Sequence, residues 1–127
     1  MPSRLQFNGA LTIAFQVADM AVAQAWYRDV LGLTPLFEVK EMGWCELATE
    51  TQGVSVGLSQ VEAPKVGAGP VPTFGVKDID AARGLLEGQG VRFDGETQVI
   101  PELVKLAGFF DPDGNVLMLS QDLGGNC

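Results

Sequence analysis

The sequence predicts an α+β protein made of two βαβββ modules. Two observations carry this prediction. Residues 12–32 read as a strand, a helix cap, an amphipathic helix and a glycine exit, and residues 71–90 repeat that order. The repeat is in register where V-A-D-M lies over V-K-D-I, so that Asp19 matches Asp78. Two copies of one supersecondary unit therefore organise the chain.

The first copy shows each element clearly. Apolar and small or polar residues alternate over residues 11–17, which is the period of a strand with one apolar face. Asp19 follows, and its carboxylate can accept the free N–H groups of a helical first turn. Apolar residues at helical spacing predict a helix over 20–31, and Gly32 provides its exit.

Three short strands complete the first module. We expect them at 34–40, 43–49 and 54–61, the last with clean alternation in V-S-V-G-L-S-Q-V. The second module has the same order, with a helix at 79–87 and strands at 71–77, 91–99, 103–110 and 115–121. We expect a single domain over residues 1–127, made of modules at about 8–61 and 71–121 and joined by a Gly- and Pro-rich linker at 62–70.

Length and composition limit the function classes. A chain of 127 residues with 46% hydrophobic residues can bury a core, and no apolar run reaches the length of a membrane span. The N-terminus lacks the apolar region of a signal peptide, so we expect a cytoplasmic protein. The net charge of −8 disfavours nucleic acid and anionic membranes as partners and mildly favours cationic small molecules.

The two cysteines predict neither a disulfide framework nor a metal site. Cys45 lies inside an expected strand and Cys127 is the last residue, with no C-x-x-C pair in the chain. We expect a buried thiol and a frayed tail.

Strand parity separates two faces of the expected sheets. The helices need the apolar face, so the opposite face presents small, hydroxylic and glycine residues with one Trp and one acid. A sheet face with so little bulk tends to enclose a cavity. Its members are Thr12, Ala14, Gln16, Trp44, Glu46, Ser55, Gly57, Ser59, Val71, Thr73, Gly75, Val116, Met118 and Ser120.

Two motifs accompany the paired modules. They are V-A-D-M with W-Y-R-D-V-L-G-L in residues 17–33, and D-P-D-G-N at 111–115. Together these features resemble the vicinal oxygen chelate superfamily. That superfamily includes glyoxalase I, extradiol dioxygenases, and fosfomycin and bleomycin resistance proteins. The resemblance covers nearly the whole chain. It implies the glyoxalase/bleomycin resistance/dioxygenase fold, in which the mixed sheets of the two modules curl into a cup. This fold hosts many chemistries, and the resemblance also implies a homodimer.

The resemblance also assigns four positions to metal ligands, usually His, Glu or Gln. In this sequence those positions hold Thr12, Gly57, Val71 and Met118, and the chain has no histidine. These side chains cannot replace the imidazole and carboxylate donors that a divalent metal needs. We therefore expect no metal and no cofactor.

Glu46 and Trp44 are the most informative candidates for a site. Glu46 could act as a catalytic general base or as a counter-ion for a cationic ligand, or it could simply reach solvent at a strand rim. Trp44 could stack on a planar ligand or fill a half-open core. Alternation turns only one of Phe109 and Phe110 toward the cup and does not distinguish them. The predicted ligand-binding residues are Thr12, Gln16, Trp44, Glu46, Ser55, Ser59, Thr73, Phe110, Met118 and Ser120.

These observations favour a metal-independent protein that binds an aromatic or cationic small organic molecule in the cup. The alternative is a glyoxalase- or dioxygenase-like enzyme, a lyase or isomerase, whose metal-free form would need Glu46 as its base. A third hypothesis is a relic of the fold with a collapsed cup and no ligand.

Overall fold

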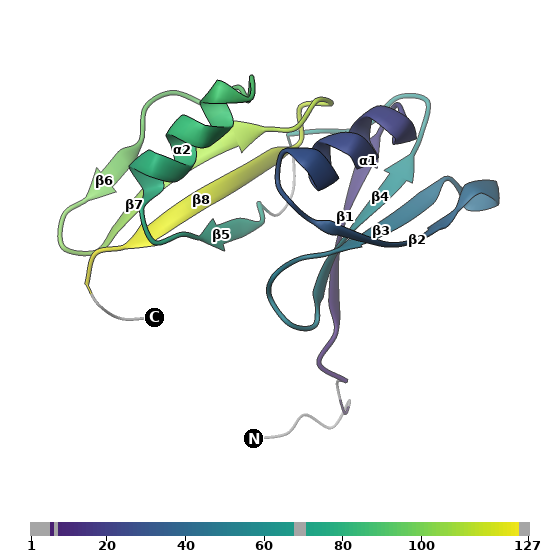
Figure 1. The fold of residues 1–127 in the computed structure, drawn as a ribbon, viewed down its shortest axis with the longest axis horizontal. Coiled ribbons are helices and arrows are strands. Elements are labelled where there is room, and N and C mark those ends of the chain that lie inside the picture. Colours follow the sequence, from purple (N-terminus) through teal and green to yellow (C-terminus); the bar gives the residue numbers. More distant parts are fainter. Residues whose placement is uncertain (1–5, 7, 68–70, 125–127) are drawn as a thin grey trace. The chain divides into compact units, whose positions relative to one another are not determined.

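The chain folds into two compact units, Met1–Pro64 and Lys65–Cys127, in a computed structural model that describes residues 6, 8–67 and 71–124. Each unit has one four-stranded mixed sheet and one α-helix, which confirms the α+β class (Figure 1). Both sheets are open. The boundary between the units falls within the predicted linker, of which residues 68–70 lie outside the described part, as does Cys127. The single domain over 1–127 stays a prediction.

The first unit has the strand order β1-β4-β3-β2. β1 pairs with β4 in parallel, and the remaining neighbours are antiparallel. Its elements are β1 (Leu11–Val17), α1 (Met20–Asp29), β2 (Thr34–Val39), the 3-10 helix η1 (Lys40–Met42), β3 (Trp44–Ala48) and β4 (Val54–Gln60).

The second unit repeats that arrangement with the order β5-β8-β7-β6. Here β5 pairs in parallel with β8, and the other pairs are antiparallel. Its elements are β5 (Thr73–Gly75), α2 (Ile79–Gly88), β6 (Gln98–Ile100), β7 (Val104–Phe110) and β8 (Val116–Asp122).

Each helix starts at two side-chain acceptors. The Asp19 carboxylate accepts from the backbone N–H of Val22 at 3.2 Å, as its position before the helix predicts. The amide oxygen of Gln60, at the end of β4, accepts from the N–H of Met20 at 2.7 Å. The second unit repeats both contacts, from Ala81 to Asp78 and from Ile79 to Gln121. The end of the last strand thus fixes the start of the helix in both units.

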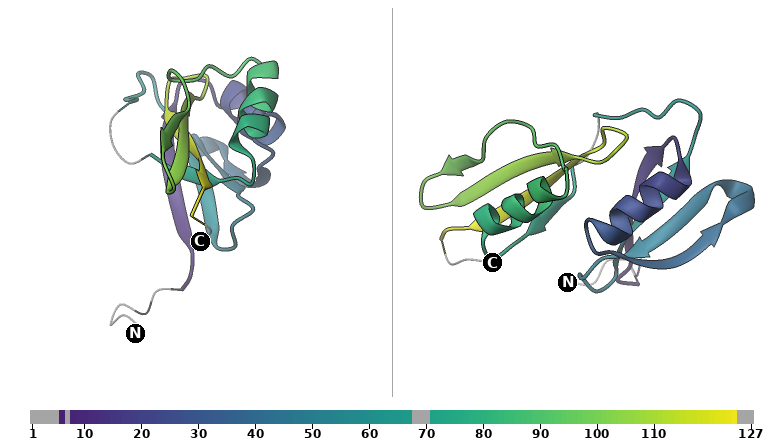
Figure 2. Two further views of the ribbon diagram at one scale, coloured as in Figure 1. Left: turned by 90° about the vertical axis from the view of Figure 1, so that its left-hand side faces the viewer. Right: turned by 45° about the horizontal axis from the view of Figure 1, so that its top comes forward.

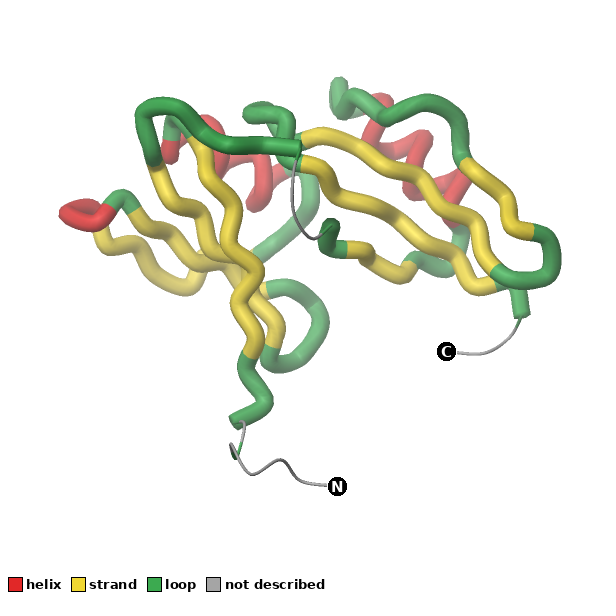
Figure 3. Tube along the Cα trace, turned by 180° about the vertical axis from the view of Figure 1, so that it is seen from behind, coloured by secondary structure: helices red, strands yellow, loops and turns green. Residues whose placement is uncertain are grey.

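The helix covers only one face of each sheet (Figure 2). In the first unit Val17, Leu58 and Tyr27 are fully buried on that side, and the rings of Phe15 and Tyr27 stack at 6.1 Å. Ile79, Phe109 and Leu117 are the fully buried large side chains of the second unit. Figure 3 shows the opposite faces, where the strands lie in front of the helices. Neither helix is long or apolar enough to cross a membrane, within the residues that the structure describes.

The strand predicted at 71–77 is shorter than expected. β5 covers only Thr73–Gly75. Pro72 has no N–H to donate to a ladder, and its carbonyl oxygen accepts from the N–H of Met118 at 3.0 Å. Val71 therefore precedes the strand instead of belonging to it.

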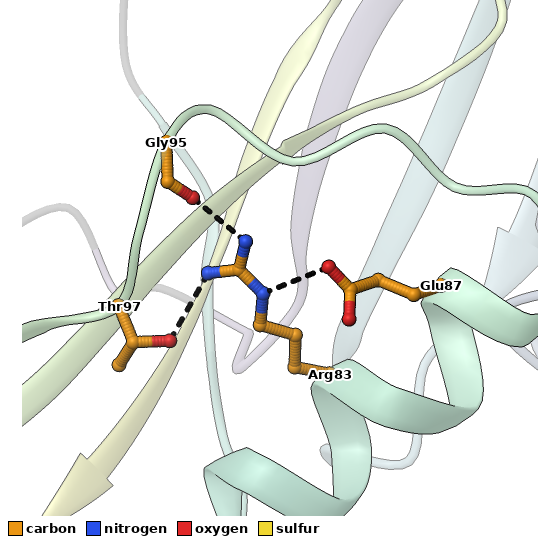
Figure 4. Close-up of polar contacts among 4 residues, drawn as sticks. All are labelled: Arg83, Glu87, Gly95 and Thr97. Atoms are coloured by element: carbon orange, nitrogen blue, oxygen red, sulfur yellow. Dashed lines mark hydrogen bonds and ion pairs between the residues drawn. The ribbon is translucent and has the colours of Figure 1, made fainter.

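The prediction of a strand over 91–99 is mostly wrong. Only Gln98–Ile100 form β6, and Phe93 makes an isolated bridge to Phe109. Arg83 of α2 pulls the intervening segment toward the helix, because its guanidinium donates to the Gly95 carbonyl at 2.7 Å and to the Thr97 hydroxyl at 3.1 Å (Figure 4). Gly95 has a φ of 75°, which ends the extended segment.

The first helix is also shorter than predicted. It ends at Asp29, with Val30 as its C-cap, and does not continue to residue 31. Gly32, with a φ of 77°, provides the predicted exit.

Candidate ligand-binding face

The face of the first sheet that α1 leaves uncovered carries six of the predicted site residues. Residues paired directly across neighbouring strands point to the same side of a sheet. The register pairs Thr12 with Ser55, Gln16 with Ser59, and Trp44 with Ser59. Glu46 pairs with Gly57 in the same ladder. The parity prediction for this face is therefore confirmed.

Glu46 is the centre of a hydrogen-bond network on this face. Its Oε1 accepts from the indole Nε1–H of Trp44 at 3.2 Å, and its Oε2 accepts from the hydroxyl of Ser55 at 2.8 Å. The Thr12 hydroxyl lies 3.3 Å from Oε2 and 3.1 Å from Ser55 Oγ. Trp44 and Ser55 thus donate to one half-buried carboxylate, Thr12 donates to that carboxylate or to Ser55, and the four predicted residues form one cluster.

Trp44 lies across the middle of the face. Its ring edge, at Cζ2 and Cη2, occupies the space into which a Cβ at Gly57 would project, and Thr12 Cγ2 lies 3.3 Å from the same point. Gly57 is buried beneath this ring. A residue without a side chain is therefore required at Gly57 for Trp44 to reach Glu46.

Phe37 is a member of this face that strand alternation did not identify. It pairs with Glu46, and the ladder between β2 and β3 shifts register between Pro35 and Phe37. A bulge moves every later residue of a strand to the other side. Phe37 is 51% exposed, so an open aromatic ring lies beside Glu46. Pro35 within β2 is the sequence signal for such an irregularity.

In the second unit the uncovered face holds the other four predicted residues. Thr73 pairs with Met118, and Phe110 pairs with Val116, so these side chains share a face. Ser120, two residues after Met118 on β8, lies on the same side. Phe109 is fully buried on the α2 side, which resolves the choice that alternation left open.

Glu102 does not lie on a strand. It has a φ of 65° and lies between β6 and β7. Lys105 does lie on β7, where its ammonium group is 3.6 Å from the Asp80 carboxylate of α2.

Cys45 lies between Trp44 and Glu46 in sequence but points to the opposite face. Its side chain is fully buried. Burial raises the pKa of the thiol above its usual value, and the negative charges of Glu38 and Glu46 raise it further. Cys45 is therefore a small apolar core residue, as predicted, and not a member of the candidate site.

The donors at the four positions that the resemblance assigns to metal ligands do not fit a divalent metal. Gly57 has no donor and Val71 lies outside β5, while Thr12 already bonds within the Glu46 cluster. Within residues 8–67 and 71–124, no three His, Cys, Asp or Glu side chains form a group that could hold a metal ion. Glu46 is a single carboxylate, and both of its oxygens accept protein hydrogen bonds.

One comparison with known proteins identifies a family. The sequence profile of the Glyoxalase/Bleomycin resistance protein/Dioxygenase superfamily matches residues 9–119. A search of the curated proteins found no match.

Three solved structures illustrate the range of similar folds. A superfamily member from Sphaerobacter thermophilus is 23% identical, with a TM-score of 0.76 over 89% of this chain and 96% of its own. TnmS3, an antibiotic-binding protein from a Streptomyces species, is 25% identical, with a TM-score of 0.72 over 89% and 94%. The fosfomycin resistance protein FosX from Listeria monocytogenes, solved with Mn(II) and sulfate, is 13% identical, with a TM-score of 0.74 over 91% of each chain.

Proposed function

The chain belongs to the glyoxalase/bleomycin resistance protein/dioxygenase superfamily, and from that premise we propose that it binds an aromatic or cationic small organic molecule without a metal. The site is the uncovered face of the first sheet. The observation that supports this proposal best is the hydrogen-bond cluster in which Trp44, Ser55 and Thr12 hold the Glu46 carboxylate in place.

Glu46 supplies the recognition of a donor. A carboxylate offers about four acceptor positions, and the protein occupies two or three of them, depending on whether Thr12 donates to Glu46 or to Ser55. At least one position remains for a ligand N–H. A cationic group would also gain from the net charge of −8. Because three strands fix the carboxylate, little conformational entropy is lost when a ligand binds.

Aromatic surface lies on two sides of that carboxylate. The indole of Trp44 is anchored by Glu46 at one edge and by contact with Gly57 along another. The Phe37 ring is exposed across the ladder. An apolar wall with few polar groups is typical of small-molecule sites. A planar cation would stack on these rings with its positive charge beside Glu46, and a ligand that carries an N–H would add a hydrogen bond. TnmS3, a structurally similar protein, binds an antibiotic.

The enzymatic alternative assigns Glu46 as a general base. It would require the carboxylate to take a proton from a substrate while two or three protein donors hold its oxygens. The same donors hold the carboxylate oxygens in fixed positions, which suits an acceptor in a binding site better than a base that must take a proton.

We also propose that the protein is a cytoplasmic homodimer, as the sequence analysis expects. β2 and β6 are edge strands of their sheets, and Leu36 and Val99 on them are 54% and 53% exposed. Light scattering of the purified protein would give the oligomeric state. A monomer at all concentrations would contradict the dimer.

A matched pair of probes tests the proposed site. N-methylquinolinium carries a permanent charge, whereas quinoline of nearly the same shape is neutral above its pKa. We expect N-methylquinolinium to bind more tightly than quinoline. Glu46→Gln should weaken the binding of N-methylquinolinium by about fivefold to tenfold and leave the binding of quinoline unchanged. Glu50→Gln, at an exposed acid between β3 and β4, is the control for net charge. Equal binding of the cation to the wild type and Glu46→Gln would contradict the proposal.

A further inference from the structure

The second unit contains two arginines that each lie on a phenylalanine ring but differ in what their nitrogens contact. The guanidinium carbon of Arg83 lies 4.4 Å from the centroid of Phe93, and that of Arg92 lies 4.5 Å from the centroid of Phe110. At this distance the face of a phenylalanine ring attracts a guanidinium through a cation–π interaction. The two side chains therefore have comparable aromatic supports.

Arg83 uses all its nitrogens within the protein. Its Nε bonds Glu87 at 3.2 Å, while its other two nitrogens bond Thr97 and the Gly95 carbonyl (Figure 4). The side chain is 19% exposed. Arg83 therefore has a structural role, which is to hold the segment before β6 against α2.

Arg92 is exposed and makes no such contacts. The ion pairs in the described part of the chain join Arg28 to Asp29, Arg83 to Glu87, and Lys105 to Asp80. No hydrogen bond from the Arg92 side chain to another described residue is present, although its backbone carbonyl accepts from the N–H of Phe110 at 3.0 Å. Its guanidinium is thus oriented by a ring while its five donors remain available.

Arg92 also belongs to the uncovered face of the second sheet. The bridge between Phe93 and Phe109 places Arg92 opposite Phe110 and Asp94 opposite Gly108. Phe93 and Phe109 lie on the α2 side, so Arg92 and Asp94 lie on the other. Strand alternation in the sequence places Phe110 on this face but does not identify either charged neighbour.

The positions that adjoin Arg92 and Phe110 on this face are mostly apolar. Phe110 pairs with Val116, and Gly108 pairs with Met118, so the adjoining positions carry two apolar side chains and one residue without a side chain. The Asp94 side chain borders this surface, since its Cβ lies 3.7 Å from the point where a Cβ at Gly108 would project. A carboxylate there disfavours a second anionic group on a ligand.

We propose that Arg92 and Phe110 form a subsite for a monocarboxylate with an aromatic or flat apolar body. The carboxylate would take two parallel N–H donors from the guanidinium, and the body would lie on Val116 and Met118 beside Gly108. This site lies within the second unit and does not depend on the function proposed for the Glu46 face.

Benzoate and benzamide provide the test, because they share shape and differ in charge. Titration of ¹⁵N-labelled full-length protein would follow amide signals from the segment 92–94 and from β7. We expect benzoate to shift these signals and to bind about tenfold more tightly than benzamide. Arg92→Met should remove that preference, and Arg92→Lys should restore only part of it. Asp94→Asn should increase the affinity for benzoate.

Two control variants separate this subsite from general charge effects. Arg28→Met removes an exposed arginine that pairs with Asp29 on α1, and Glu50→Gln removes the charge of an exposed acid between β3 and β4. Both should leave benzoate binding unchanged. The proposal is overturned if benzoate produces no shifts in the 92–94 segment, if benzamide binds as tightly, or if Arg92→Met with a native spectrum keeps the preference for the anion.

Discussion

The indole of Trp44 lies directly over Gly57, in the space that any larger residue at that position would fill. The family resemblance assigns Gly57 to a metal ligand, and in this chain the tryptophan ring covers it. The same ring donates its N–H to Glu46 at 3.2 Å. The absence of a side chain at Gly57 and the position of the Trp44 indole beside Glu46 are therefore parts of one arrangement.

Gly57→Ala should displace Trp44. The added methyl group would collide with the ring edge, and the backbone beneath it cannot move without breaking two ladders. We expect a loss of about 1–3 kcal/mol in the free energy of unfolding. Emission from Trp44 should shift to longer wavelength in a Trp26→Phe background, where Trp44 is the only tryptophan. Gly75→Ala is the matched control, since a Cβ there has no neighbour within 4 Å. An unchanged emission spectrum in Gly57→Ala would contradict the contact.

Ser55→Ala should lower the free energy of unfolding more than Ser59→Ala does. Both serines are half-buried on the same face of β4, but only Ser55 donates to Glu46, at 2.8 Å. Hydrogen bonds to charged groups are stronger than neutral ones, so we expect a loss of about 1–2 kcal/mol for Ser55→Ala and little change for Ser59→Ala. Urea unfolding would measure both. Equal losses for the two variants would show that Ser55 does not support the carboxylate.

Gln60→Ala should destabilise the first unit by weakening the start of α1. The Gln60 amide oxygen accepts from the N–H of Met20 at 2.7 Å, and its removal leaves a helical N–H without that acceptor. The expected cost is about 1 kcal/mol. Gln60→Glu keeps an acceptor and adds a negative charge at a helix N-terminus, so it should retain or raise stability. Both outcomes would be read from thermal unfolding. Unchanged stability of the Gln60→Ala variant would contradict the role assigned to this cap.

The thiol of Cys45 should resist modification while the protein is folded. In a Cys127→Ser variant it is the only thiol, and it is fully buried. A disulfide reagent should react with it slowly in buffer and rapidly in denaturant. Fast reaction of the folded protein would show that the core around Cys45 opens readily.

The raised pKa of this thiol also predicts a pH dependence. The folded state favours the neutral thiol, so its contribution to stability is complete below the usual value of 9.0 and is lost as pH rises through the higher folded pKa. Cys45→Ala should remove that part of the alkaline loss of stability. The comparison requires unfolding curves for both proteins across the same alkaline range.

Much of the fold could be predicted from the sequence because the two copies report the same pattern. Alternation over β1 and β4 assigned faces correctly, and Asp19 and Asp78 marked both helix starts. The strand limits that the repeat predicts for the second unit, however, are partly wrong. Pro72 delays β5, and the interactions of Arg83 remove most of the expected strand before β6.

The candidate site was only partly predictable. Parity can bring Thr12, Trp44, Glu46 and Ser55 to one face, but their hydrogen bonds depend on side-chain rotamers that no pattern specifies. Phe37 was missed because a bulge reverses parity within β2. Arg92 was missed even though V-R-F-D alternates, because the sequence does not show that its guanidinium lies on Phe110.

One titration tests the central claim, metal-independent binding on the Glu46 face, most directly. The Trp26→Phe protein is dialysed against EDTA and titrated with N-methylquinolinium, with Trp44 emission as the signal. We predict saturable binding with the same Kd before and after Mn(II) or Zn(II) is added, and a weaker Kd for Glu46→Gln. Binding that appears only with added metal, or a stoichiometric metal that survives dialysis, would contradict the claim and favour a metal-dependent enzyme.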